Sequence, residues 1–407
     1  MQVVHERCCG LDVHKKNVVA CVLTNEGKRV RTFGTVTREL LRLLDWLREE
    51  RITHLAMEST GVYWRPLYNL LEGHGIELMV VNPAHMKAVP GRKTDVKDAE
   101  WTADLLRHGL LRGSRIPGRP QRELQEAVRY RRKLVDMRAD EVRRLQKVLE
   151  GGNIKLGDVA TDVMGLSGRD MLRALVEGEE DTARLAEFAR GRMRRKRDQL
   201  ESALEGSIGQ HQRFMLSHLL QHIEFVEGQI EQLSVEIEAR MRPFEAHMES
   251  LQRIPGIGRR SVEAILAEIG VEMRYWPTDE AMASWAKICP GNNESGGKRR
   301  STSIGRGNQS LRSALVEATL AAIRVRDSYF SALYHRVATR RGAKRAIIAV
   351  AHAILIVIYH MLKDGTVYSE LGGDYFERVD REAILRRSVR RIEKLGYEVT
   401  LHEMSAA

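Results

Sequence analysis

The sequence predicts an α/β domain at the N-terminus followed by a long, mainly helical region. Strand-like and helix-like patterns alternate through the first hundred residues, whereas beyond Pro117 and Pro120 apolar residues recur at helical spacing. The length of 407 residues exceeds one ordinary core, so two or three domains are expected. A hydrophobic content of 43% is sufficient to fill their interiors.

A β-hairpin is predicted to open the α/β domain. Residues 8–23 are rich in Val and Leu, the sequence NEGK at 25–28 can turn the chain, and residues 29–36 can return as an antiparallel strand. The pattern then predicts a helix over 38–50, a strand over 53–57, a helix over 62–72, a strand over 77–81 and a helix over 95–106. This alternation is typical of a sheet with helices packed on it.

Two later segments carry heptad patterns. The first spans residues 124–149 and has Arg131 and Arg138 at two seam positions, which weakens the interpretation as a dry core. The second spans residues 216–237 and steps by three and four without interruption. We expect a coiled-coil arm, in which the two segments pair as an antiparallel hairpin or the second one dimerises.

The charge balance favours a polyanionic partner. Lys and Arg number 66 against 55 Asp and Glu, for a net charge of +11, and the cations are clustered. Nucleic acid is therefore expected ahead of a membrane surface. Six of the eight residues at 190–197 are basic, which suits either a solvated helix face or contact with phosphates.

Localisation is expected to be cytoplasmic. The four cysteines form no C-x-x-C pair, which fits reduced thiols, and the polar N-terminus does not resemble a secretion signal. The apolar stretch at 346–362 is slightly short for a membrane span and contains His352, Tyr359 and His360, so a buried helix is the better interpretation.

Four carboxylates stand where they could hold a metal ion. Asp12 interrupts an apolar strand, where an unpartnered charge is costly, and Glu58 follows the strand at 53–57. Asp95 and Asp98 are three residues apart on a predicted helix and share one face. Hard oxygen donors of this kind suit Mg²⁺ or Mn²⁺, and two such ions about 4 Å apart can activate an attacking oxygen and stabilise a leaving oxygen of a phosphodiester.

Each carboxylate also has an ordinary structural explanation. Asp12 could be an interior acid paired with Lys15 or Lys16, and Glu58 could be a helix cap. Asp95 and Asp98 could be surface acids beside Lys93 and Lys97. Taken singly, these explanations are at least as good as the metal role.

A glycine-rich basic loop carries a serine. The segment PGNNESGGKRR at 290–300 places Ser295 beside Gly296 and Gly297 and ahead of three cations, Lys298, Arg299 and Arg300. Backbone of this kind can approach a phosphate closely. Ser295 could be a nucleophile activated by a base or metal, or it could only donate a hydrogen bond to phosphate. The turn containing Gly256 and Gly258 could likewise bind phosphate through exposed amides, or simply join two helices.

These segments together resemble a known family. Residues 10–15 (GLDVHK), 57–64 (MESTGVYW), 81–83 (VNP) and 93–99 (KTDVKDA) look, in order and context, like the signature blocks of the DEDD insertion-sequence transposases of the IS110/IS1111 family. The segment from 251 to about 364 is similar to the C-terminal transposase domain of that family, through its IPGIG turn, its SGGK loop and its GRGN turn, which includes Arg306.

The resemblance implies a fold, a chemistry and partners. The N-terminal domain would be RuvC-like, with an RNase H-type fold, and its metal ligands would be Asp12, Glu58, Asp95 and Asp98. Ser295 matches the serine that becomes linked to DNA in that family, while Ser301 and Ser303 are weaker competitors. The likeness further implies donor and target DNA, a structured noncoding guide RNA, and a nucleoid-associated protein of a bacterium or archaeon.

The sequence therefore predicts a transposase or recombinase in three parts and a tail. The parts are an RNase H-like metal domain at 1–118, a helical coiled-coil arm at 119–245, a mainly helical C-terminal domain at 246–370, and a charged tail at 371–407. Because a long linker separates Asp98 from Ser295, the two halves of the site can come from different subunits, and we expect a dimer or tetramer. Nucleic-acid contacts are expected at Gly256, Gly258, Gly296, Gly297, Lys298, Arg299, Arg300 and Arg306.

Three other classes of protein fit parts of the pattern. A RuvC-like junction nuclease would use water as the nucleophile, with Ser295 only touching phosphate. A noncatalytic scaffold would bind nucleic acid with ordinary surface and core acids. A sugar-kinase-like ATPase would need a second phosphate-binding hairpin and an adenosine pocket, and neither pattern is found in the sequence.

Overall fold

The computed structural model describes residues 2–59, 61–82, 98–289, 293–295, 298–301, 305, 307–379 and 381–400. It divides into two compact units, Met1–Arg119 and Pro120–Ala407. Each unit has its own hydrophobic core.

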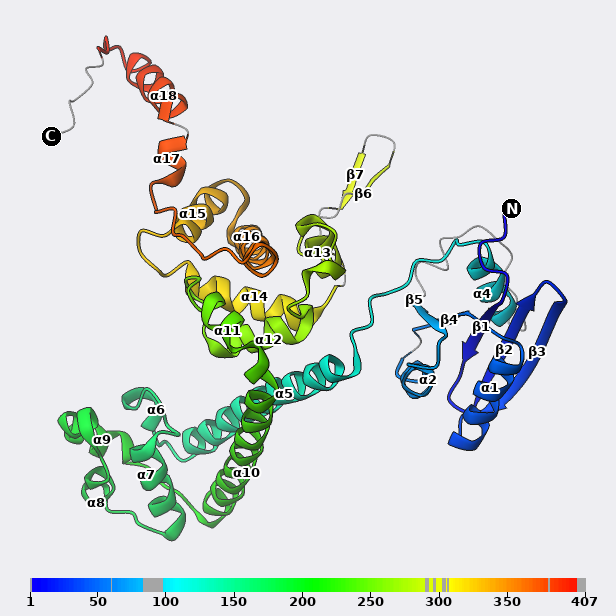
Figure 1. Cartoon of the computed structure of the whole chain (residues 1–407). Coiled ribbons are helices and arrows are strands. Elements are labelled where there is room, and N and C mark those ends of the chain that lie inside the picture. The colour runs from blue at the N-terminus through cyan, green and yellow to red at the C-terminus, as the bar shows by residue number, and fades with distance from the viewer. Residues whose placement is uncertain are drawn as a thin grey trace. The chain divides into compact units, whose positions relative to one another are not determined.

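The N-terminal unit is built on a mixed sheet of five strands (Figure 1). The strands are β1 (Cys8–Val13), β2 (Asn17–Thr24), β3 (Gly27–Gly34), β4 (His54–Glu58) and β5 (Glu77–Val81), in the order β3-β2-β1-β4-β5. β1 is antiparallel to β2 and parallel to β4, which is consistent with the expected RNase H-like domain. The sequence analysis placed residues 8–23 in one strand of the hairpin. This prediction was wrong, because the chain turns at residues 14–16 and the segment forms two strands, β1 and β2.

Helices cover both faces of this sheet. Cys9 and Leu11 face the core formed with α1 (Thr37–Glu49) and α2 (Trp64–Leu71). The alternate residues face α4 (Asp98–Arg107), since successive side chains of a strand point to opposite faces. At Gly10 a Cβ atom would stand 2.3 Å from the backbone nitrogen of Ala103, so only glycine lets α4 pack this closely.

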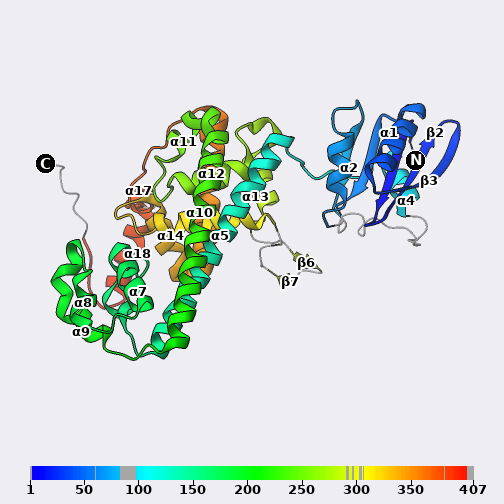
Figure 2. The ribbon, with the colours of Figure 1, turned by 90° about the horizontal axis from the view of Figure 1, so that it is seen from below.

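Two long helices, α5 (Arg119–Gly151) and α10 (Gln210–Met241), run side by side in the C-terminal unit (Figures 1 and 2). They are antiparallel, because Glu123 near the start of α5 pairs with Arg240 near the end of α10 at 3.3 Å. The two heptad segments therefore pair within one chain. Val135, at an expected seam position, is 43% exposed, so the hydrophobic seam between them is interrupted.

The two arginines at the seam of α5 are neutralised by acids on neighbouring helices. Arg131 donates to Glu263 at 2.6 Å, and Arg138 donates to Glu227 of α10 at 2.7 Å. The side chain of Arg131 is only 7% exposed. A charged residue at a seam position therefore does not prevent helix packing when a carboxylate faces it.

A small helical lobe packs on one end of the pair of long helices. It shares a core with both of them that includes Leu145, Leu172 and Leu220. The lobe consists of α6 (Leu156–Val159), α7 (Leu166–Glu177), α8 (Thr182–Glu187), η2 (Gly191–Lys196) and α9 (Arg197–Leu204).

The rest of this unit is mainly helical. Its elements are η3 (Arg242–Phe244), α11 (Glu245–Leu251), α12 (Arg259–Ile269), η4 (Met273–Tyr275), α13 (Asp279–Ala286), β6 (Asn293–Ser295), β7 (Lys298–Ser301), α14 (Gln309–Ala322), α15 (Tyr329–Arg341), α16 (Ala343–Asp364), α17 (Tyr375–Val379) and α18 (Arg381–Glu393). Where the sequence predicted a glycine-rich basic loop around Ser295, β6 and β7 form a two-stranded sheet.

Helix α16 is apolar and long enough to cross a membrane, and no other helix in the described parts of the chain passes that test. Its residues Val350, Ile354 and Ile358 are fully buried in the core of the C-terminal unit. The apolar composition of α16 is therefore explained by its place in a protein interior, as the sequence predicted.

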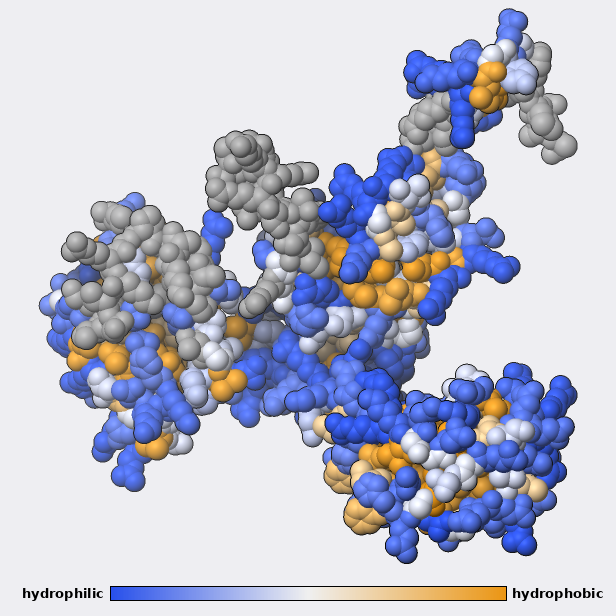
Figure 3. Space-filling model, turned by 180° about the vertical axis from the view of Figure 1, so that it is seen from behind, coloured by the Kyte–Doolittle hydropathy of each residue, from blue (hydrophilic) through white to orange (hydrophobic). Residues whose placement is uncertain are grey.

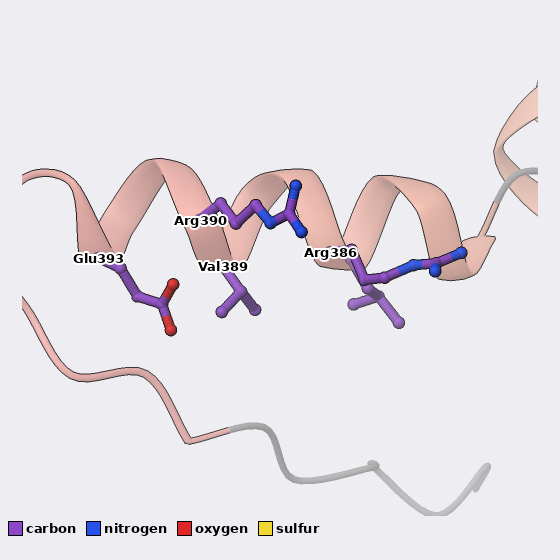
Figure 4. A pocket seen from close by; sticks show the side chains of 5 residues that line it. Arg386, Val389, Arg390 and Glu393 are labelled. Carbon is purple, nitrogen blue, oxygen red and sulfur yellow. The ribbon is translucent and has the colours of Figure 1, made fainter.

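The face shown in Figure 3 is mostly hydrophilic, with hydrophobic residues gathered in several areas. A hollow of about 290 Å³ beside α18 is lined by Leu385, Arg386, Val389, Arg390 and Glu393 (Figure 4). Because all of these residues come from one helix, the hollow is a surface groove rather than an enclosed site.

Candidate active site

Asp12 and Glu58 stand next to each other at the ends of adjacent parallel strands. Leu11 of β1 is paired in register with Met57 of β4, and the acids are the next residue on each strand. Their neighbours two residues back, Gly10 and Ala56, face α4. Because side chains alternate along a strand, both acids lie on the α4 face of the sheet.

Asp98 is brought to the same end of the sheet by the direction of α4. The carbonyl of Arg107, the last residue of α4, accepts N–H bonds from Val4 at 2.9 Å and His5 at 3.1 Å, just ahead of β1. Ala99 and Ala103 cover Gly10 in the middle of β1. The helix therefore runs antiparallel to β1, and its first residue, Asp98, lies toward the end of β1 that carries Asp12.

The two strand acids do not have the partners that the ordinary explanations named. The Asp12 side chain is 22% exposed, and its carboxylate lies at hydrogen-bond distance, 2.9 Å, from the ring of His14, while no ion pair with Lys15 or Lys16 is found among the described residues. Glu58 ends β4, whereas the residue at the N-cap position of α2 is Tyr63. The sequence reasoning missed His14, although a strand pattern that places residues 12 and 14 on one side could have indicated it.

The carboxylate oxygens of these residues are of the chemical type that binds a divalent metal ion. Three carboxylates at one end of one sheet face supply the hard oxygens that Mg²⁺ and Mn²⁺ prefer. Asp95, the fourth predicted ligand, lies outside the described residues. Among the residues whose positions are described, no three acidic, histidine or cysteine side chains stand close enough to share an ion.

Ser295 is the last residue of β6, at the closed end of a two-stranded sheet. It is paired across the sheet with Lys298, and Arg299 is paired with Glu294. The strand β7 thus places Lys298, Arg299 and Arg300 opposite the strand that carries the serine. Gly296, Gly297 and Arg306 lie outside the part of the chain that the structure describes.

The chain that leaves the β6–β7 sheet is anchored by Asn308. Its Oδ1 accepts the N–H of Leu311 at 3.1 Å and so caps α14, while its Nδ2 donates to Glu268 of α12 at 2.6 Å. Glu268 is 1% exposed and also accepts two bonds from Arg129 of α5, each at 2.7 Å. The sequence reasoning missed Glu268, whose only signal is an acid within the apolar pattern of α12.

The two glycines of the turn before α12 differ in their surroundings. Gly256 has a φ of +81°, and a Cβ there would lie 2.3 Å from the backbone nitrogen of Ala322 in α14. Its conformation and this close packing both require glycine. Gly258 is exposed and stands at the N-cap position of α12, so the expected phosphate contact at this turn stays a prediction.

The strand order, with acids near the ends of the central strands, is consistent with an RNase H-like domain. Residues 9–154 match the transposase model of the DEDD type from IS110, and residues 248–335 match the model described as transposase of the IS116/IS110/IS902 family. The two matches together cover more than half of the chain, and the chain belongs to the IS110 family of transposases. A comparison with curated proteins finds no match.

Membership in this family establishes the protein as a DNA-transposing enzyme, with DNA as its partner. A DEDD-type domain further indicates the use of a divalent metal.

Proposed function

We propose that the protein cuts and rejoins DNA through a covalent link between Ser295 and DNA, assisted by divalent metal held by the acidic quartet. The observation that carries this proposal is the in-register placement of Asp12 and Glu58, with Asp98 at the start of the helix on the same face. These hard oxygen donors belong to the same end of one sheet face, in a domain of the DEDD type, which supports a shared metal site.

The bond changes balance without a nucleotide cofactor. The Ser295 oxygen forms a bond to phosphorus while the bond from phosphorus to one deoxyribose oxygen breaks. The serine proton passes to a base, and the freed deoxyribose oxygen takes up a proton. Rejoining reverses this step with the hydroxyl of another strand, so the phosphodiester linkage is conserved.

The acidic residues would hold and orient the ions. Asp12, Glu58, Asp95 and Asp98 would be the ligands, and His14, bonded to Asp12 at 2.9 Å, would fix the orientation of that carboxylate. Bound Mg²⁺ or Mn²⁺ supplies positive charge that stabilises the charge developing on the phosphate oxygens. The cations on β7 would hold the DNA backbone beside Ser295.

The proposal includes a guide RNA and an oligomer. The resemblance to the signature blocks of the family implies a structured noncoding RNA that selects donor and target DNA, and we include it in the proposal. The acids and Ser295 belong to different compact units, which allows a site composed from two subunits. We infer a dimer or tetramer for this reason.

A strand-exchange assay tests the proposal. Purified protein, the RNA encoded near its gene and Mg²⁺ would be combined with donor and target DNA, using Ser295→Ala, Asp12→Ala and Ser301→Ala. We expect the first two variants to lose exchange by about a thousandfold or more while they still bind DNA, because each lacks a reacting or charge-stabilising group. The control Ser301→Ala keeps exchange, and chelation of the metal abolishes it.

A covalent protein–DNA species should be trapped with the wild type and be absent with Ser295→Ala. Exchange at the full rate by Ser295→Ala would mean that another group is the nucleophile. Release of cut DNA without any covalent species would instead favour hydrolysis by water, as in a junction nuclease.

A further inference from the structure

Four cations gather at the corner between α15 and α16, outside both segments that match the transposase models. Gly342, with a φ of +83°, ends α15 and begins α16. The cations Arg340, Arg341, Lys344 and Arg345 flank it, and all four are exposed. We call these four residues the α15–α16 basic corner.

The basic corner has no counter-charge among the residues that the structure describes. None of its four side chains forms an ion pair or hydrogen bond with any residue that the structure describes. The start of α12 offers a contrast, because Arg259 there is bound by Glu245 at 2.6 Å and Arg260 by Glu263 at 3.0 Å. The cations at the start of α12 are thus neutralised by acids, whereas those at the start of α16 are not paired with any acid that the structure describes.

Two of the four cations also oppose the dipole of their own helix. Lys344 and Arg345 lie in the first turn of α16, where the unpaired backbone N–H groups carry positive charge. That turn contains no acidic residue, and no side chain caps it. The arrangement is unfavourable in the isolated chain, and a bound polyanion would relieve it.

We propose that the α15–α16 basic corner binds the phosphodiester backbone of a nucleic-acid duplex. Guanidinium groups are suited to bidentate phosphate contacts, and four cations within six residues can span consecutive phosphates. The corner carries no exposed aromatic side chain between the cations, so it contacts backbone rather than unstacked bases. This inference depends on the proposed function in one respect only, which is that the partner is a nucleic acid.

The test is the salt dependence of binding. The quadruple variant Arg340→Gln, Arg341→Gln, Lys344→Gln and Arg345→Gln would be compared with the full-length wild type by fluorescence anisotropy, using labelled duplex DNA and duplex RNA in separate arms without divalent metal. We expect the slope of log affinity against log salt to become shallower by about 0.9 for each DNA phosphate that the variant no longer neutralises.

A second quadruple variant controls for the change in net charge. It carries Gln at Arg42, Arg143, Arg173 and Arg184, which are exposed and each face an acid on the protein. Its slope should stay close to that of the wild type. A shallower slope on DNA, on RNA or on both supports the proposal and identifies the duplex. An unchanged slope, or the same change in both variants, overturns it.

Charge reversal at the helix start gives an independent readout. Lys344→Glu with Arg345→Glu should raise the Tm by about 2 °C, because the new charges favour the helix dipole, and should weaken duplex binding at the same time. A higher Tm with undiminished binding also overturns the proposal. Because binding is measured without strand exchange, failure here leaves the assignment of Ser295 untouched, and failure of that assignment leaves this result standing.

Discussion

Arg131 and Glu263 form an ion pair inside the C-terminal unit, with side chains that are 7% and 0% exposed. Burial lowers the pKa of Arg131, while the bond to Glu263 at 2.6 Å opposes that shift. Removing Arg131 takes away one charge-assisted bond from the fully buried Glu263, which keeps Arg260 at 3.0 Å and Arg259 at 3.6 Å as partners. We predict that Arg131→Ala lowers the free energy of unfolding by about 1.5 to 3 kcal/mol, measured by urea titration.

Two further variants separate the buried charge from loss of packing. The double variant Arg131→Met with Glu263→Leu should recover most of the lost stability, since no charge then remains buried. Arg42→Ala, which breaks an exposed pair with Glu39, should cost less than about 1 kcal/mol. Equal losses in the buried and exposed single variants would contradict this explanation.

Gly10 determines how closely α4 approaches β1. In Gly10→Ala the new methyl group would lie 2.3 Å from backbone atoms of Ala99 and Ala103, so the helix that begins with Asp98 must shift. We predict a loss of about 1 to 3 kcal/mol in stability, measured by urea titration, together with a lower rate of strand exchange. Gly118→Ala is the matched control, because a Cβ there meets nothing within 4 Å.

The candidate metal site could be predicted from the sequence in part, for a local reason. Asp12 and Glu58 interrupt or end apolar strands, so the pattern itself indicates that each needs a partner. That the two are neighbours depends on strand order, which local patterns do not contain. The roles of Gly10 and Glu268 depend on packing between segments far apart in the chain.

At the scale of elements, strong hydrophobic periodicity predicted the long helices correctly, whereas the short strands could not be predicted. The heptad patterns predicted α5 and α10, but the choice between pairing in one chain and dimerising depends on contacts such as Glu123 with Arg240. The strands β6 and β7 were expected to be loop, because three or four residues rich in Asn, Lys and Arg carry no strand signal.

Glu227 joins three helices through its carboxylate. Burial raises the pKa of this group, but hydrogen bonds from Arg138 of α5 and Arg169 of α7 outweigh burial and lower the pKa below its usual value near 4.5. A group whose pKa is lower in the folded state stabilises the fold above its unfolded pKa. That stabilisation is lost as the pH falls through the folded pKa.

We predict that Glu227→Gln destabilises the protein by about 1 to 3 kcal/mol at pH 7, because two charge-assisted bonds are weakened. The difference from the wild type should shrink as the pH falls from 4.5 through the lowered folded pKa of Glu227, because both proteins then carry a neutral side chain at this position. Urea titrations at pH 7 and at acid pH check this. A difference that does not depend on pH would show that packing, not charge, is what the substitution removes.

At the scale of the whole molecule, the division into two compact units predicts separate unfolding. Residues 1–119 and 120–407 each contain a core of their own, so we expect two transitions in scanning calorimetry. Gly10→Ala should lower the midpoint of one transition and Arg131→Ala that of the other. A single transition that moves with both variants would mean that the units unfold together.

Glu268 links the start of α14, where the chain returns from the strand bearing Ser295, to Arg129 in the first third of α5. A twist of α5 about its own axis therefore pulls on Asn308 unless the bonds from Arg129 to Glu268, or the bond from Asn308 to Glu268, first break. Force applied to the long helix by a bound partner would in this way reach the base of the hairpin that carries Ser295 through a single carboxylate.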